Sequence, residues 1–295
     1  MPPGAIQLVV PFEAGGGSDE AARTFARYAA PHFGDRIEVV NRTGASGATG
    51  YRIGAAAPAD GRTLMLMVAS LIAGPHAGQG YGVDYRDFTP LCLLATMPLV
   101  WCVRTDNVLR TFSQALADAR ARPGRLTLGT AGPGTFVDLS ASALERMAGA
   151  NFARRTYAGS AAQLQALSAG ELDIAQVSAD EALPLAWAGE LRVLAVLGNA
   201  PSPAMPNVPT TAEHGIDLNV GFFRGIGAPL GLPPSVTAAL ERACAATAAD
   251  EAYQQHLRRQ GATPHFLAGA PYRAWLDGLD RDFAAAVAFE QTENA

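Results

Sequence analysis

The stretch "VVPFEAGGGSDEAARTF", residues 9–25, joins an apolar run to an amphipathic segment through three glycines. The apolar run is typical of a buried strand. After it, Ala22, Phe25 and Ala29 recur at helical spacing. Ser18 is predicted to cap the start of this helix. A strand, a glycine loop and a helix in this order predict an α/β fold, in which ligands lie beyond the carboxyl ends of the strands.

The alternation of apolar strands and helices continues along the chain. Strands are predicted at residues 6–12, 37–41, 63–68, 97–106, 126–130, 152–157, 172–177, 191–196 and 220–229. Helices are predicted at residues 18–33, 47–57, 235–260 and 271–289. Near-continuous apolar strands that alternate with helices imply mostly parallel sheets flanked by helices.

The order of these elements predicts two domains. The chain leaves a first α/β unit near residue 103, builds a second, and returns near residue 225. We therefore expect a discontinuous domain of residues 1–103 and 226–295, a second domain of residues 104–225, and a ligand cleft between them. Two crossings form a two-segment hinge, and such hinges commonly support closure around a ligand.

Composition excludes several classes of function. The chain has 295 residues, a net charge of −5 and no lysine, and it lacks a basic run. Nucleic acid is therefore not expected as a partner, and Schiff-base catalysis or a P-loop lysine is excluded. The three cysteines and five histidines show no metal-ligand spacing. We expect no metal and no cofactor.

Two further observations concern location. No apolar run of the sequence reaches membrane-spanning length. The opening "MPPGAIQLVV" has no charged leader region and runs directly into a predicted strand. We therefore expect either a cytosolic protein or a chain that begins at a mature domain.

A second glycine loop has the same context as the first. In "LGTAGPGTFVDLSASALERM", residues 128–147, Thr135 and Asp138 have capping-box spacing. The first N–H groups of a helix lack internal partners and favour an anion, and glycine lets a ligand approach the backbone. Two such loops could hold the two ends of one elongated molecule. A plain tight turn is the alternative for each loop.

The role of Asp19 has two interpretations. Its carboxylate could satisfy the helix N-terminus, or it could accept a hydrogen bond from a ligand amine or hydroxyl. Glu13 adds a second negative charge beside the same loop. Two acids near an anion site repel an anion unless a ligand amine or hydroxyl offsets them, so the ligand is predicted to differ from a plain dicarboxylate.

An ordered set of motifs resembles the solute receptors of the tripartite tricarboxylate transporters, also called Bug-type periplasmic binding proteins. It consists of Pro11, Phe12, Gly15, Gly16, Asp19, Ala22 and Arg23, then Asn41, Gly44, Ala45 and Gly47, then "PADGRTL" at 58–64 and "YAGSAA" at 157–162. The segments "GELDIAQ", "GELRVLAV", "PNVPTTAEHG" and "GAPLGLP" follow in the order of the family. The resemblance covers nearly the whole chain. One departure is Ala158, where the family usually has lysine.

The resemblance implies a periplasmic, type II Venus-flytrap receptor and not an enzyme. Its ligand would be a small carboxylate, such as a di- or tricarboxylate, an amino acid or an aromatic acid, which it would deliver to integral-membrane transporter subunits. A receptor that must hinge freely is expected to be a monomer. The resemblance further implies that backbone N–H groups and ordered water hold the carboxylate, without a salt-bridging arginine. A hydrolase-like enzyme and a sensor that feeds a signalling partner are the alternatives.

The resemblance also implies a set of ligand contacts. In the first domain they are Phe12, Ala14, Gly16, Gly17, Asp19 and Ser70. In the second domain they are Ala131, Gly132, Gly134, Thr135, Tyr157 and Asp180. No catalytic residue is predicted.

Overall fold

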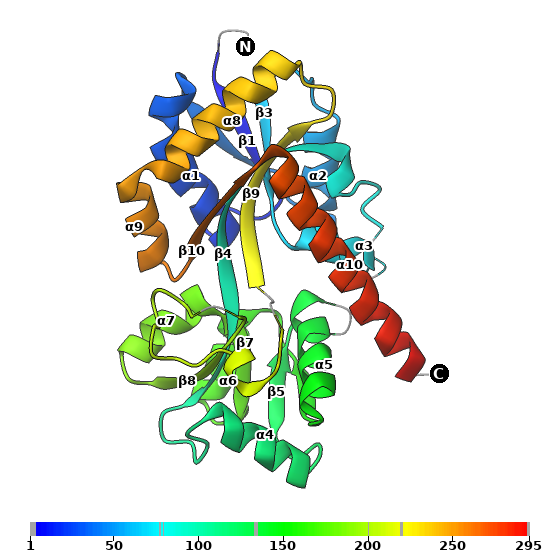
Figure 1. Cartoon of the computed structure of the whole chain (residues 1–295), viewed down its shortest axis with the longest axis vertical. Helices are drawn as coiled ribbons and strands as arrows, with labels where there is room; N and C mark the ends of the chain where they lie inside the picture. Colours follow the sequence, from blue (N-terminus) through cyan, green and yellow to red (C-terminus); the bar gives the residue numbers. More distant parts are fainter. Residues whose placement is uncertain are drawn as a thin grey trace. The chain divides into compact units, whose positions relative to one another are not determined.

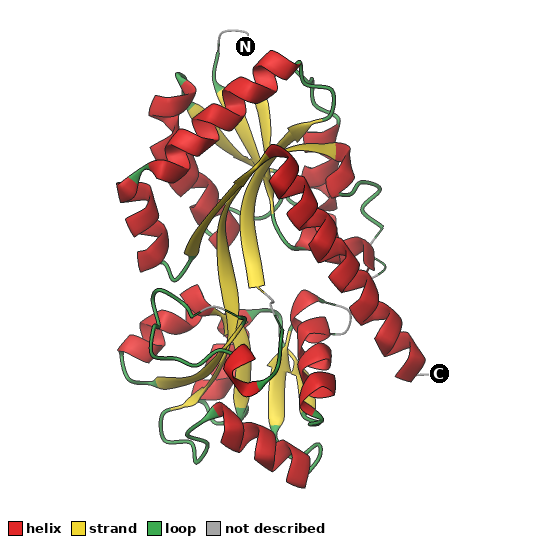
Figure 2. Ribbon diagram, viewed as in Figure 1, coloured by secondary structure: helices red, strands yellow, loops and turns green. Residues whose placement is uncertain are grey.

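The computed structural model describes residues 4–293 except 77, 79, 133, 134, 200, 219 and 220, with side chains described as far as residue 284. The chain forms two compact units. Unit 1 contains residues 1–96, 223–257 and 264–282, and unit 2 contains residues 97–222, 258–263 and 283–295. Figures 1 and 2 show the elements of both units.

Unit 1 is built on a mixed sheet. Its strands follow the order β2 (Ile37–Asn41), β1 (Ile6–Val10), β3 (Thr63–Met67), β9 (Gly221–Pro229) and β4 (Phe88–Arg104), and β10 (Thr263–Ala268) also pairs with β4. Strand β1 is parallel to both β2 and β3, whereas β3 is antiparallel to β9. Its helices are α1 (Gly17–Phe33), α2 (Ala48–Ala55), α3 (Ser70–His76), α8 (Pro234–Ala249), α9 (Glu251–Arg259) and α10 (Gly269–Glu293).

The apolar pattern of the opening stretch explains the core of unit 1. Ile6, Leu8 and Val10 of β1 are fully buried. The predicted apolar stripe of α1 is confirmed, because Ala22, Phe25 and Ala29 are all buried. Helix α1 ends at Gly34, whose left-handed φ of 68° suits glycine. Helices α1 and α8 pack side by side (Figure 1).

Unit 2 has a second mixed sheet. Its strands follow the order β4, β7 (Ile174–Ser178), β5 (Thr127–Thr130) and β6 (Ala153–Thr156), and β8 (Leu191–Leu197) also pairs with β4. Strand β5 is parallel to β6 and β7, whereas β4 is antiparallel to β7 and β8. Its helices are α4 (Phe112–Ala121), α5 (Phe136–Ala148), α6 (Ser160–Ser168) and α7 (Ala179–Trp187).

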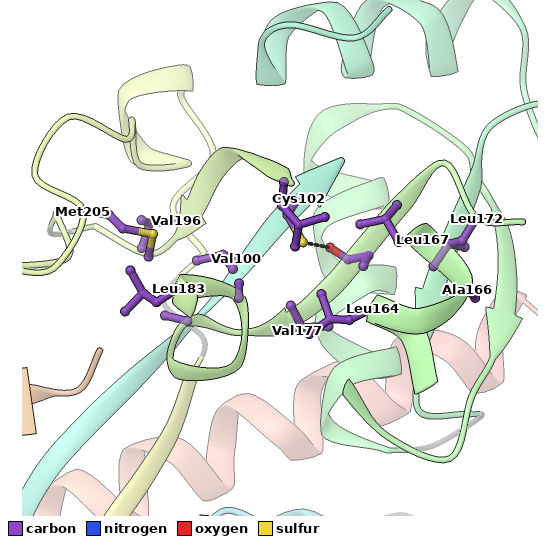
Figure 3. Close-up of a cluster of buried hydrophobic side chains, with 14 residues drawn as sticks. Val100, Cys102, Leu164, Ala166, Leu167, Leu172, Val177, Leu183, Val196 and Met205 are labelled. Carbon is purple, nitrogen blue, oxygen red and sulfur yellow. Dashed lines mark hydrogen bonds between the residues drawn. The ribbon is translucent and has the colours of Figure 1, made fainter. Parts of the chain in front are cut away.

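A cluster of buried side chains holds α6 and α7 against the sheet of unit 2 (Figure 3). Val100 and Cys102 of β4 meet Val177 of β7, Leu164 of α6 and Leu183 of α7 in this cluster. The Cys102 thiol points to the Ala175 carbonyl, with 3.7 Å from sulfur to oxygen. Burial raises the pKa of Cys102 to about 12, so this thiol stays protonated at neutral pH.

The structure corrects several predicted elements. Strand β4 begins at Phe88 rather than Met97, and β10 was not predicted. The predicted helix over residues 235–260 is two helices, because Asp250 is extended and its carboxylate accepts from the Tyr253 N–H at 2.9 Å. This contact caps a new helix start. Within the described residues, no helix has the length and apolarity needed to cross a membrane.

Candidate functional site

The first glycine loop ends in a helix that a glycine caps. Residues 13–17 are exposed, and they include the predicted contacts Ala14, Gly16 and Gly17. The N-cap of α1 is Gly16, with φ −84° and ψ 168°, so the prediction of Ser18 as N-cap is wrong. Because Gly16 carries no side chain, no described side chain caps the first N–H groups of this helix. This helix start can therefore donate to an approaching anion.

Asp19 holds the loop in shape from within. One carboxylate oxygen accepts from the Gly15 N–H and from Arg23 Nε, each at 2.9 Å. The other accepts from Asn41 Nδ2 at 3.0 Å. The hydrogen bond from Arg23 is the largest influence on the pKa of Asp19 and lowers it, which outweighs the opposite effect of burial. Asp19 is therefore an ionised positioning group, and its contact with a ligand stays a prediction.

Asn41 extends this network to the strand end. Its amide also donates to the Phe12 carbonyl at 3.0 Å, so one side chain from β2 joins both ends of the loop that follows β1. Phe12 itself is half-buried. A Cβ at Gly47 would lie 3.4 Å from Phe12 Cζ, so the phenyl ring covers this glycine closely.

Residues 44–47 form a turn with an unusual backbone. Gly44, Ala45, Ser46 and Gly47 all have positive φ, at 124°, 48°, 55° and 102°. Positive φ is uncommon for residues other than glycine and persists only where surrounding contacts hold it. One such contact is the Tyr81 hydroxyl, which donates to the Ser46 carbonyl at 3.1 Å.

Ser70 lies at the start of α3, just after β3. Its hydroxyl is 2.8 Å from that of Tyr51, a fully buried side chain of α2. Burial raises the pKa of Tyr51 above its usual range. The Tyr51 hydroxyl therefore stays neutral and holds the half-buried Ser70 hydroxyl, which lies at the same edge of the sheet as the first loop, since β1 and β3 are parallel.

The second glycine loop differs in its cap. Ala131 is half-buried and Gly132 is buried with φ 100°, whereas Gly134 lies outside the described residues. The predicted cap at Thr135 is confirmed. Its hydroxyl oxygen accepts from the Asp138 N–H at 3.3 Å, and its proton goes to the Gly132 carbonyl at 2.6 Å. The Thr135 hydroxyl thus acts as both donor and acceptor within the loop itself.

Tyr157 and Asp180 follow β6 and β7, the two strands that flank β5 in unit 2. The Tyr157 N–H donates to the Thr130 carbonyl at 3.0 Å, and its half-buried side chain packs against the core cluster. Asp180 is half-buried and accepts from the Ser178 hydroxyl. Because β6 and β7 both pair in parallel with β5, the second loop, Tyr157 and Asp180 all lie at the same edge of the sheet.

A fully buried glutamine fixes the helix of the second loop. Gln176 accepts from Trp101 Nε1 at 2.7 Å, and its amide donates to the Val137 carbonyl at 2.6 Å and to Ser140 Oγ at 2.8 Å. These bonds tie the first turns of α5 to β4 and β7. A satisfied buried network of this kind resists displacement of the helix.

Three side chains of the first loop region were not predicted from sequence: Asn41, which clamps the loop, Tyr51, which is bonded to Ser70, and Arg224 of β9, whose Nη2 lies 3.7 Å from the position of a Cβ on Gly17. Asn41 stands in a quoted motif, which was a usable signal. Tyr51 and Arg224 belong to segments far from residues 11–19 in sequence, so no local pattern indicates them. In the described part of the chain, His, Cys, Asp and Glu side chains form no group of three or more that could hold a metal.

Two α/β units with glycine loops at the carboxyl ends of parallel strands are typical of α/β proteins that bind a small ligand. Comparison with known proteins gives the family. The model of the tripartite tricarboxylate transporter family receptors matches residues 21–272. The chain belongs to this family, which confirms the resemblance and the receptor class.

Individual relatives cover most of the chain. A protein encoded in the tcbD-tcbE intergenic region of Pseudomonas sp. strain P51 is 34% identical over 91% of this chain and 82% of its own length. A ligand-free TctC solute-binding protein from Polaromonas has a TM-score of 0.84 at 30% identity, over 98% of both chains. The R. palustris protein Rpa4515, solved with adipate, has a TM-score of 0.76 at 29% identity, over 98% of this chain and 95% of the other.

Proposed function

We propose that this receptor binds a small metabolite carrying at least one carboxylate, and that the glycine loops after β1 and β5 provide its contacts. The observation that carries the proposal is the exposed start of α1, where Gly16 leaves the first N–H groups without a side-chain cap. Helix N-termini of this kind bind carboxylates through backbone donors and the helix dipole.

The pairing of Asp19 reduces the repulsion that the sequence suggested. Asp19 is buried and bonded to Arg23, so its charge is offset within the loop. Glu13 remains exposed on the same loop. The adipate bound to the R. palustris relative supports a carboxylate ligand at 29% identity. A ligand that also carries a hydroxyl or amine would suit Glu13.

The proposal also covers the cellular location of the protein and its partner subunits. We propose that the protein works in the periplasm and passes its ligand to integral-membrane transporter subunits, as a monomer and without catalysis. Membership of a transporter receptor family supports this. The predicted domain division, with its ligand cleft, is part of the same proposal.

The test is a ligand screen on protein that has been unfolded and refolded to remove co-purified molecules. Thermal shift would be measured with mono-, di- and tricarboxylates, amino acids and aromatic acids, and hits would be titrated by calorimetry. A ligand at a hundredfold excess over its Kd stabilises the folded state by about 2.7 kcal/mol. If no acid shifts the melting temperature and an uncharged solute does, the assignment of a carboxylate ligand would be overturned.

A further inference from the structure

Strand β9 brings an arginine to the edge of the sheet where the first loop lies. Strand β9 runs antiparallel to β3, with Gly225 opposite Met67, the last residue of β3. Arg224 therefore lies at the carboxyl end of β3. Because β1 is parallel to β3, this edge also carries the first glycine loop and Ser70.

The two faces of β9 show where the Arg224 side chain points. Phe223 packs on Trp275 of α10, with 5.0 Å between ring centroids, and a Cβ at Gly225 would meet Tyr272 of the same helix. Side chains alternate along a strand, so Arg224 points to the opposite face. Its Nη2 lies 3.7 Å from the position of a Cβ on Gly17, the first residue of α1.

The guanidinium group is half-buried and held by its own strand. Nη1 donates to the Phe223 carbonyl at 3.1 Å. Burial raises the pKa of Tyr51, and the charge of Arg224 acts in the opposite direction, so the guanidinium is within electrostatic range of the Tyr51 hydroxyl, which is bonded to Ser70. The guanidinium of Arg224 thus lies beside the start of α1 and within electrostatic range of Tyr51 in α2.

Apart from the exposed Glu13, the charges around this position favour an anion. The nearby Asp19 carboxylate is paired with Arg23, and the start of α1 carries the positive end of the helix dipole. A guanidinium group presents parallel donors that match the two oxygens of a carboxylate. Unit 1 therefore presents a cation beside backbone donors at one point of the glycine loop.

We infer that Arg224 is a specificity-determining residue of this receptor, which pairs with a carboxylate of the ligand beside the N–H groups at the start of α1. The inference rests on the proposed function and deepens it. It requires the ligand to be anionic at the end that meets unit 1. It also replaces the expectation from sequence that no arginine takes part in binding.

The experiment uses calorimetry of the full chain with malate, succinate and adipate, and with succinamide as an uncharged probe. For each acid that the wild type binds, Arg224→Gln is expected to raise the Kd about thirtyfold or more, since a charged hydrogen-bonded partner is lost. Arg36→Gln is the matched control, because Arg36 is exposed at the opposite end of β2, and its Kd should equal that of the wild type. The acid-to-amide affinity ratio should fall in Arg224→Gln alone.

Three results would contradict the role of Arg224 in ligand binding. Wild-type affinity in Arg224→Gln, with acids still bound, would overturn the inference and leave the proposed function standing. An equal loss in Arg36→Gln would also overturn it, because the effect would then be one of general charge. If neither these acids nor any acid of the ligand screen binds the wild type while an uncharged solute does, the proposed function fails and the inference fails with it. Should Arg224→Gln not fold, Arg224→Lys decides, with an expected loss of about tenfold and unchanged affinity as the contrary result.

Discussion

The two glycine loops follow the same plan but satisfy their helices differently. In the loop after β1 the cap is Gly16, and the carboxylate of Asp19 reaches back to hold the Gly15 N–H. In the loop after β5 the cap is Thr135, whose hydroxyl serves the Asp138 N–H and the Gly132 carbonyl. The first loop leaves its helix start to an outside acceptor, whereas the second uses a helix donor internally. The comparison teaches that the first loop should contribute more to binding an anion.

The largest effect is expected from a side chain placed at the first helix start. Gly16 has negative φ, and its nearest contact for an added Cβ is the Glu13 carbonyl at 3.7 Å, so Gly16→Val should fold normally. The branched side chain would shield the backbone donors, and the affinity for the ligand found by the screen should fall about a hundredfold or more, equivalent to about 2.8 kcal/mol. Calorimetry would measure it.

Gly80→Val is the matched control for this change, because Gly80 is exposed and an added Cβ has open space. It should bind as the wild type does. Wild-type affinity in Gly16→Val would contradict the claim that the helix start of the first loop binds the anion.

A smaller effect is expected from removing the charge that shapes the first loop. Asp19→Asn removes the ion pair with Arg23. It also places an NH2 group, which cannot accept, where an oxygen accepts hydrogen bonds from the N–H groups around it. We expect the free energy of unfolding to fall by about 1–3 kcal/mol and the ligand affinity to fall about tenfold. Urea denaturation and calorimetry would measure the two effects. Glu20→Gln, which changes an exposed acid on the same turn, should leave both near wild type.

The same carboxylate predicts a pH dependence. The pKa of Asp19 is lower in the folded state than in the unfolded chain, chiefly because Arg23 donates to it. Its stabilisation is therefore fully present above the ordinary carboxyl pKa of about 4 and is lost as the pH falls through the folded value. The difference in unfolding free energy between wild type and Asp19→Asn should be constant from pH 7 to pH 5. This difference should decrease below about pH 4. A decrease already between pH 5 and pH 7 would contradict a lowered pKa of Asp19 in the folded state.

The smallest effect is expected at the second loop. Thr135→Ala removes the cap of α5 and should lower the free energy of unfolding by about 0.5–2 kcal/mol. Ligand affinity should fall less than tenfold, because the hydroxyl acts within the loop. Thr135→Ser should restore stability. Thr111→Ala, which removes the equivalent cap of α4, should cost similar stability without changing affinity. A loss from Thr135→Ala as large as that from Gly16→Val would reverse the comparison.

Much of the candidate site could be predicted from sequence because it is local. Residues 9–25 show the strand, the glycines and the helix in one continuous pattern, and β1 and α1 follow it closely. The cap at Thr135 was predictable because it depends on a residue only three positions away. The cap of α1 was predicted wrongly. Ser18 satisfies the sequence rule, but the helix begins earlier, with Gly16 as its cap and the Asp19 carboxylate accepting the Gly15 N–H just before the first turn.

The sequence by itself determined the alternation of strands and helices, the two loops and the family, because these depend on short spacings and on the order of motifs. Only the tertiary structure decided which distant side chains complete the first loop. Asn41 reaches it through the parallel pairing of β1 and β2, and Arg224 reaches it through the antiparallel pairing of β3 and β9. Strand register places a residue more than two hundred positions away beside Gly17. Register depends on how the hydrophobic pattern of a strand matches that of its partner, and the partner of β9 is known only once the sheet is assembled.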